Sequence, residues 1–179
     1  NGTTKMHCSH SILVVEDNPE VLNLVGKLLS REYHVLTASN GKEALLVLKE
    51  NTVDLIISDI MMPEMDGIEL CKMLKNNIEY SHIPIVLLTA KSEEQDRAIA
   101  YESGADAFIS KPFSLNVLNA RIKNLLIRKE RAARDFKAQL VIEIKDLEYT
   151  NLDEQFIKKA IDCVNQHLDN PDFGQEQFA

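Results

Sequence analysis

Short apolar runs alternate along the first 128 residues with longer segments whose apolar residues recur at helical spacing. The short runs indicate strands, and an uninterrupted apolar run is typical of a strand that is covered on both faces. We expect five strands, at residues 11–15, 34–38, 54–59, 83–88 and 105–110. A helix is expected after each of them, beginning after Asn18, near residue 40, after Asp66-Gly67, after Ser92 and after Ser114.

The alternation of five strands with five helices predicts an α/β fold built on a doubly wound parallel sheet. Right-handed crossovers would place helices on both faces of that sheet. A flavodoxin-like sheet of this kind has strand order 2-1-3-4-5, and its ligand crevice lies at the switch between strands 1 and 3. The fold class alone therefore indicates where a functional site should be.

The pattern weakens after residue 128, where a C-terminal helical extension is expected. Residues 129–137 are charged and rich in alanine, which favours a continuation of the preceding helix, whereas residues 140–144 favour a strand and have no place in the sheet. An apolar stripe over residues 156–168 has no partner in the remaining sequence. We therefore expect a disordered tail (1–10), a main domain (11–128), a linker (129–151) and the truncated start of a helical domain (152–179).

Composition narrows the classes of function. The chain of 179 residues has a net charge of −8, and no segment is basic enough to hold nucleic acid by charge alone. No apolar run reaches the length of a membrane span and no signal-peptide pattern is present, so no membrane contact by this fragment is expected. The three cysteines are far apart and lack metal-binding or redox spacing. Free thiols favour a reducing compartment, and we expect a cytoplasmic location.

Polar side chains stand at the ends of four predicted strands. They are Glu16 and Asp17 after the first strand, Asp59 at the third, Thr89 at the fourth and Lys111 at the fifth. Because parallel strands end at a common edge, these groups should converge on one crevice. Three carboxylates so close together repel one another unless a cation lies among them. Oxygen ligands of this kind suit Mg²⁺, which we expect as the cofactor.

These residue types at one edge suit phosphoryl transfer. Asp59 would act as the nucleophile, because a carboxylate can form an aspartyl-phosphate. The Lys111 ammonium suits one phosphoryl oxygen as a point charge, and the Thr89 hydroxyl can donate a hydrogen bond to another. Taken singly, Asp17 could be a helix cap, Thr89 a strand former and Lys111 a surface charge. The combination is what favours a site.

Four segments together resemble the receiver domain of two-component response regulators. They are residues 14–18 (VVEDN), 59–67 (DIMMPEMDG), 88–90 (LTA) and 104–113 (GADAFISKPF). The resemblance covers about residues 11–128. It implies that Asp59 accepts a phosphoryl group from a phosphohistidine of a sensor kinase domain, with Mg²⁺ as cofactor.

The same resemblance implies a metal site and a switch. The metal ligands would be Glu16, Asp17, Asp59 and the backbone carbonyl of Met61. A cis peptide bond is implied between Lys111 and Pro112. Thr89 and the aromatic Phe108 would respond to phosphorylation and reshape the face made by the fourth helix, the fifth strand and the fifth helix. Because Phe108 lacks a hydroxyl, its part in the switch would depend on burial of the ring.

Residues 146–179 look like the approach to an AraC-type DNA-binding domain, of which only the first helix and the start of the next would be present. Such a join is similar to hybrid two-component systems, in which sensor, kinase, receiver and DNA-binding domain share one chain. The resemblance implies transcriptional control in the full-length protein, with DNA bound only through the missing C-terminal part. A helical linker or a dimerisation arm is the alternative interpretation.

Other functions remain open at this point. A degenerate receiver would act as a docking or dimerisation domain, and a haloacid-dehalogenase-like phosphatase would use an Asp nucleophile on the same type of sheet. The second interpretation is weakened because residues 59–61 lack that family's second aspartate and no cap-domain insertion exists. The fragment also has no glycine-rich ATP-binding pattern, which excludes kinase activity of its own. Mixed charges on the fourth and fifth helices suit a symmetric homodimer contact, through Asp96, Arg97, Leu118, Arg121 and Lys123. An ordinary solvated face is the alternative interpretation of these residues.

Overall fold

The structure is a computed structural model that describes residues 10–90, 101–145, 159 and 162. The chain divides into two compact units, Asn1–Lys129 and Glu130–Ala179. The first unit contains all the strands of the described residues. No helix in the described part of the chain is long and apolar enough to cross a membrane.

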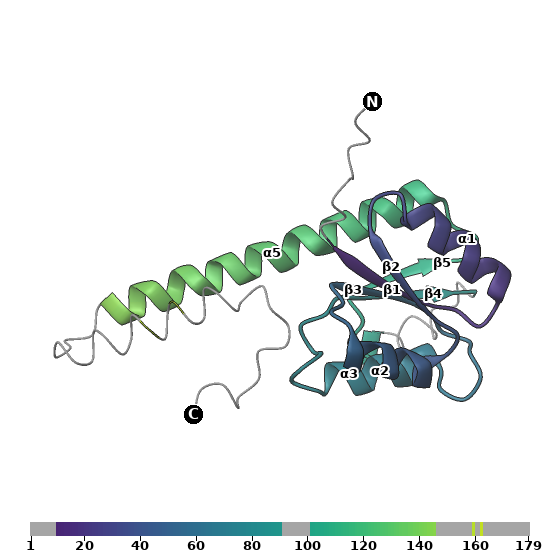
Figure 1. The fold of residues 1–179 in the computed structure, drawn as a ribbon, viewed down its shortest axis with the longest axis horizontal. Helices are drawn as coiled ribbons and strands as arrows, with labels where there is room; N and C mark the ends of the chain where they lie inside the picture. Colours follow the sequence, from purple (N-terminus) through teal and green to yellow (C-terminus); the bar gives the residue numbers. More distant parts are fainter. Residues whose placement is uncertain (1–9, 91–100, 146–158, 160–161, 163–179) are drawn as a thin grey trace. The chain divides into compact units, whose positions relative to one another are not determined.

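A sheet of five parallel strands forms the centre of the first unit (Figure 1). The strands are β1 Ser11–Val15, β2 His34–Ala38, β3 Leu55–Asp59, β4 Ile85–Thr89 and β5 Ala107–Ser110. Their order is β2-β1-β3-β4-β5, so β2 and β5 are the edge strands. The predicted doubly wound, flavodoxin-like sheet is confirmed, and its switch point lies between β1 and β3.

Helices follow the strands as the sequence predicts. The described helices are α1 Pro19–Leu29, α2 Gly41–Glu50, α3 Gly67–Lys75 and α5 Leu115–Lys145. The first three begin beside side chains that accept hydrogen bonds from free amide groups, namely Asn18, Asn40 and Asp66. The helix predicted after Ser92 lies outside the described residues except for its last part, where residues 101–102 are helical.

Two apolar clusters cover the two faces of the sheet. On one face, side chains such as Ile57 of β3 pack with Leu29 of α1 and Leu118 of α5. On the other face, side chains such as Ile56 pack with Leu70 of α3 and with residues of α2. Figure 1 shows α2 and α3 together on one side of the sheet and α1 on the other. Each large side chain buried in this way contributes roughly 1.5–3 kcal/mol, which explains why β1, β3 and β4 are almost wholly apolar.

Helix α5 differs from the prediction at its C-terminal end. It extends from Leu115 to Lys145, so residues 140–144, which favour a strand by composition, are helical. The alanine-rich residues 129–137 have high helix propensity, and extending an existing helix is easier than forming a strand that has no partner. The strand preference assigned to residues 140–144 is therefore wrong. The rest of the predicted linker and helical domain (152–179) lies outside the described residues, apart from helical positions 159 and 162.

The residues predicted to form a dimer contact are only partly available for one. Leu118 of α5 is fully buried in the apolar cluster against the sheet, so its inclusion in a dimer surface was wrong. The Nζ atom of Lys123 lies 3.0 Å from Oε2 of Glu32 in an ion pair within the chain. Asp96 and Arg97 lie outside the described residues. A homodimer stays a prediction without a defined surface.

Candidate functional site

The carboxyl edge of the sheet brings the predicted site residues to neighbouring positions. Glu16 and Asp17 follow β1, Asp59 ends β3, Thr89 ends β4 and Lys111 follows β5. Strands β1 and β3 pair in parallel, with Val15 opposite Ser58, so the acidic pair and Asp59 leave adjacent strands side by side. Local sequence thus provides the residue types, and the strand register sets their separation.

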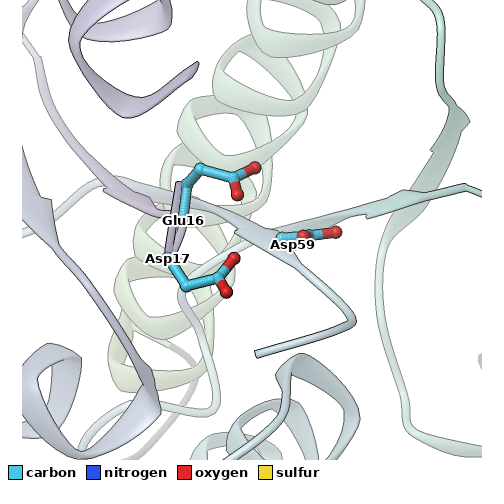
Figure 2. Close-up of side chains that lie close together, drawn as sticks. All are labelled: Glu16, Asp17 and Asp59. Carbon is cyan, nitrogen blue, oxygen red and sulfur yellow. The ribbon is translucent and has the colours of Figure 1, made fainter. Parts of the chain in front are cut away.

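Three carboxylates form a cluster at this edge (Figure 2). One oxygen from each of Glu16, Asp17 and Asp59 lies within 4.8 Å of the other two. Glu16 and Asp59 are buried, with 3% and 7% of their surface exposed, whereas Asp17 is exposed. Like charges at this spacing repel one another, so the cluster needs positive charge among its members. A small, hard cation that keeps several waters meets this need, and the donor set fits Mg²⁺.

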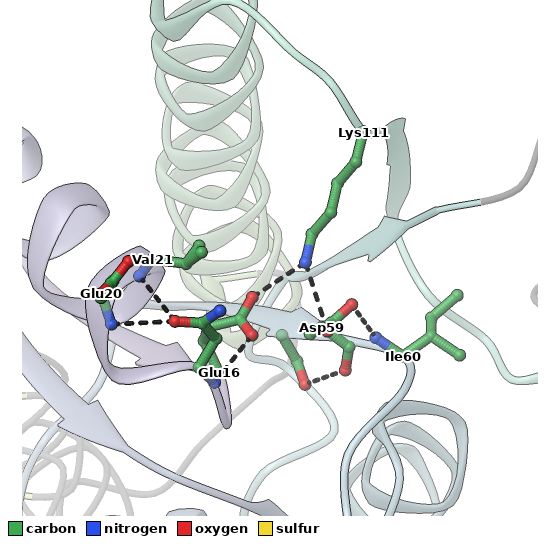
Figure 3. Close-up of polar contacts among 8 residues, drawn as sticks. Glu16, Glu20, Val21, Asp59, Ile60 and Lys111 are labelled. Carbon is green, nitrogen blue, oxygen red and sulfur yellow. Dashed lines mark hydrogen bonds and ion pairs between the residues drawn. The ribbon is translucent and has the colours of Figure 1, made fainter.

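The Lys111 ammonium lies between the two buried carboxylates (Figure 3). Its Nζ atom is 2.9 Å from Oε2 of Glu16 and 3.2 Å from Oδ2 of Asp59. Burial by itself would lower the pKa of Lys111, but the hydrogen bond to Glu16 and the charges of Asp59 and Glu16 outweigh it, and the pKa is raised. Lys111 therefore stays a cation at neutral pH and offsets part of the repulsion among the carboxylates.

Backbone amides orient the same two carboxylates. The amide of Asn18 donates to Oε1 of Glu16 at 3.1 Å, and the amide of Ile60 donates to Oδ1 of Asp59 at 2.9 Å. Each carboxylate thus has one oxygen bound to the backbone and the other directed to Lys111. The loops that follow β1 and β3 therefore determine which oxygen faces the crevice.

Gly67, the first residue of α3, supports the site in a way that the sequence pattern does not reveal. Its amide donates to the carbonyl of Ile60 at 2.9 Å. A Cβ atom at this position would lie 2.1 Å from the carbonyl oxygen of Asp59, a separation that no side chain can occupy. Glycine thus allows α3 to begin directly against the Asp59 backbone. Sequence reasoning identified Asp66-Gly67 only as a helix start, because this close approach depends on the path of the intervening loop.

The predicted switch residues lie on β4 and β5. Thr89 is buried, and it is opposite Ser110 in the register between the two strands. Phe108 is half-buried on β5, and its ring packs edge-to-face with that of Tyr101, with ring centroids 5.1 Å apart. Tyr101 was not among the predicted site residues, because no spacing rule connects the end of a helix to a ring on the following strand.

Two expectations from the resemblance concern the backbone around the site. The peptide bond between Lys111 and Pro112 is cis, as expected. Met61 lies in the loop after β3, and its side chain is 74% exposed. Any contribution of Met61 to the site would therefore come from its backbone, and its role as a metal ligand stays a prediction.

The sequence matches proteins of one family. The family model of the response regulator receiver domain matches residues 12–123. A histidine kinase of Formosa agariphila is 41% identical over 169 residues, which are 94% of this chain and 12% of the kinase. The alkaline phosphatase synthesis transcriptional regulatory protein PhoP of Bacillus subtilis is 46% identical over 123 residues, which are 68% of this chain and 50% of PhoP. This chain thus spans half or less of the length of these two relatives.

Solved structures agree with the sequence matches. The receiver domain of a histidine kinase from Syntrophus aciditrophicus has a TM-score of 0.63 at 42% identity, and the match covers 65% of this chain and 89% of that domain. The response regulator TrrA of Thermotoga maritima, solved in complex with Mg²⁺ and BeF, has a TM-score of 0.58 at 33% identity, with 65% and 98% covered. Because the family model matches well over half of the sequence and the sheet has the same architecture, the chain belongs to the response regulator receiver domain family.

Proposed function

We propose that this receiver is a phosphoacceptor in which Asp59 takes a phosphoryl group from a phosphohistidine of a histidine kinase. The observation that carries the proposal is the buried Asp59 carboxylate, which has one oxygen 3.2 Å from Lys111 and two further carboxylates beside it. A carboxylate can attack phosphorus, and a nearby cation reduces its repulsion from an anionic phosphoryl group. The names of the relatives support this type of donor, since the relative from Formosa agariphila is a histidine kinase and the solved receiver domain from Syntrophus aciditrophicus comes from one.

The proposed transfer is a displacement at phosphorus. An oxygen of Asp59 forms the new bond to phosphorus while the bond to the imidazole nitrogen breaks, and that nitrogen keeps the electron pair. Lys111 and the Thr89 hydroxyl donate hydrogen bonds to phosphoryl oxygens. Mg²⁺, when bound, would neutralise charge on the transferring group. The residues that would hold it are Glu16, Asp17, Asp59 and the backbone carbonyl of Met61.

Thr89 and Phe108 would convert phosphorylation into a change of surface. The added negative charge draws the Thr89 hydroxyl toward Asp59, and the ring of Phe108 turns into the space that it leaves. The strand register supports this coupling. Thr89 is opposite Ser110, and Phe108 precedes Ser110 by two residues, so all three side chains lie on the same face of the sheet. The responding surface would comprise the fourth helix, β5 and the first turns of α5.

In the full-length protein, this switch would control transcription through a C-terminal DNA-binding domain. The match to the Formosa agariphila kinase covers 94% of this chain, so it must include part of the segment after residue 129. This supports an origin in a hybrid histidine kinase. PhoP and the Staphylococcus aureus regulator SrrA are transcriptional regulatory proteins by name, and the SrrA match covers 80% of this chain. The AraC-type character of residues 152–179 is part of the proposal.

Incubation with acetyl phosphate and Mg²⁺, followed by measurement of the intact mass, tests the phosphoacceptor. Wild-type protein should gain one phosphoryl group, and Asp59→Asn should gain none, because Asn keeps the size of the side chain and lacks the nucleophilic oxygen. Asp66→Asn is the matched control, since Asn caps the start of α3 as well as Asp does.

The outcomes separate the alternatives. Equal labelling of the wild type and Asp59→Asn would place the nucleophile elsewhere and refute the assignment. If neither protein is labelled and neither binds Mg²⁺, the chain is a degenerate receiver that acts as a docking domain. Labelling of the wild type and Asp66→Asn alone supports Asp59 as the acceptor.

A further inference from the structure

We propose that Tyr101 is a positioning residue that holds the Phe108 ring in its outward position and so sets how readily this receiver switches. The proposal rests on the switch described above and adds a residue to it. Its basis is a contact between two rings that come from different elements, the end of the fourth helix and strand β5.

The path of the backbone brings these rings together. The amide of Gly104 donates to the carbonyl of Tyr101 at 3.1 Å, and Gly104 has a φ of +82°, a left-handed conformation that ends a helical turn. The chain then reverses into β5, which places Phe108 beside Tyr101. Their centroids are 5.1 Å apart and their planes meet at 64°, an edge-to-face arrangement that aromatic pairs favour.

The two rings differ in exposure. Phe108 is half-buried and packs against the apolar cluster on the α2–α3 face of the sheet. Tyr101 is 70% exposed and is not part of that cluster, and its ring contacts the ring of Phe108. In an equilibrium between two ring positions, an edge-to-face pair shifts the equilibrium constant by roughly 2- to 10-fold toward the position that contains it.

This contact favours only one of the two positions of Phe108. A ring that turns along the face of the sheet toward Thr89 moves away from Tyr101 and gives up the contact. Tyr101 therefore stabilises the unphosphorylated arrangement, and its removal shifts the equilibrium toward the inward position by the same factor. A ligand that binds only the inward state then binds more tightly by that factor, as long as the inward state is the minor one.

Beryllofluoride, a mimic of the phosphoryl group, provides the test. Wild-type protein, Tyr101→Phe and Tyr101→Ala are titrated with it in the presence of Mg²⁺, and the methyl NMR signals of Leu87, opposite Phe108 in the register, report binding. The midpoint should fall by roughly 2- to 10-fold in Tyr101→Ala. It should stay at the wild-type value in Tyr101→Phe, because the ring remains.

A second background separates the ring contact from other effects. In Phe108→Ala protein, adding Tyr101→Ala should leave the midpoint unchanged, since the partner ring is already absent. Thermal unfolding of each variant checks that the fold is retained. An unchanged midpoint in Tyr101→Ala, or an equal shift in the Phe108→Ala background, would refute the role of Tyr101 alone. Failure of the wild-type protein to bind beryllofluoride would refute the proposed phosphoacceptor function as well.

Discussion

Lys111 is the residue that makes two buried carboxylates tolerable at the carboxyl edge of the sheet. Without Mg²⁺, Lys111→Ala should lower the free energy of unfolding by about 1–3 kcal/mol, because Glu16 loses a charge-assisted hydrogen bond while it stays buried beside Asp59. The loss should be smaller in a Glu16→Gln background, where the repulsion between the carboxylates is absent. A double-mutant cycle from urea unfolding measures this difference, and strictly additive effects would contradict the role assigned to Lys111.

Cys71 is a second residue whose ionisation is linked to folding. Its buried thiol donates to the carbonyl of Ser103 at 3.4 Å, and burial raises the pKa of Cys71. An unfolded thiol has a pKa of about 8.5, so the folded thiol keeps its proton at a higher pH than the unfolded one. The contribution of Cys71 to stability is therefore complete below the pKa of the unfolded thiol, and it is lost as the pH rises through the pKa of the folded thiol.

Urea unfolding of wild-type protein and Cys71→Ala, between about pH 7 and pH 10, tests this linkage. The free energy of unfolding should fall less steeply with pH in the Ala variant. Cys8 and Cys163 are present in both proteins, so the difference between the two pH profiles isolates Cys71. Parallel profiles would show that the pKa of Cys71 is the same in the folded and the unfolded state, which would contradict the linkage.

At the scale of elements, Gly67 determines how closely α3 approaches the end of β3. Gly67→Ala should destabilise the fold by about 1–3 kcal/mol, because its Cβ would overlap the carbonyl of Asp59. It should also slow labelling by acetyl phosphate, since the Asp59 backbone must shift. Gly26 in α1 is the matched control, because a Cβ there would lie 3.9 Å from the nearest side-chain atom, on Thr37. Gly26→Ala should stabilise the fold by about 0.5–1 kcal/mol, and effects of the same sign at both positions would contradict this account.

The elements that sequence reasoning predicted correctly are those that local pattern determines. The apolar run before Asp59 must be a covered strand, and Asn18 and Asp66 are side chains that cap helices, so the strand ends could be assigned and brought to one edge. Two features could not be predicted, namely the close approach of Gly67 to Asp59 and the pairing of Tyr101 with Phe108. Both depend on the course of a loop between elements. The length of α5 was also missed, since the preference of residues 140–144 for a strand has no effect without a partner strand.

At the scale of the whole molecule, ion pairs connect helices to the sheet at its amino edge, opposite the site. There the Nζ atom of Lys75 in α3 lies 2.8 Å from Oδ2 of Asp106, and that of Lys129 in α5 lies 3.2 Å from Oδ1 of Asp54. Asp54 also accepts from the amide of Ser11 at the start of β1. These contacts connect helices α3 and α5 to residues that precede strands at the amino edge. The two edges of the sheet thus differ in role, since the acidic cluster lies at the carboxyl edge and these helix contacts lie at the amino edge.

Lys129 therefore belongs to the receiver, one residue beyond the boundary at 128 that the sequence pattern predicts. A fragment of residues 10–129 should retain both the cooperative unfolding and the phosphoryl labelling of the full chain, because both apolar clusters end before Lys129. Lys129→Ala in that fragment should lower its free energy of unfolding by about 0.5–1.5 kcal/mol. A fragment that ends at residue 124 also lacks the buried Leu125 and Leu126, and it should lose about 3–6 kcal/mol. If it unfolds at the same urea concentration as 10–129, residues 125–129 of α5 do not stabilise the receiver and its boundary lies earlier.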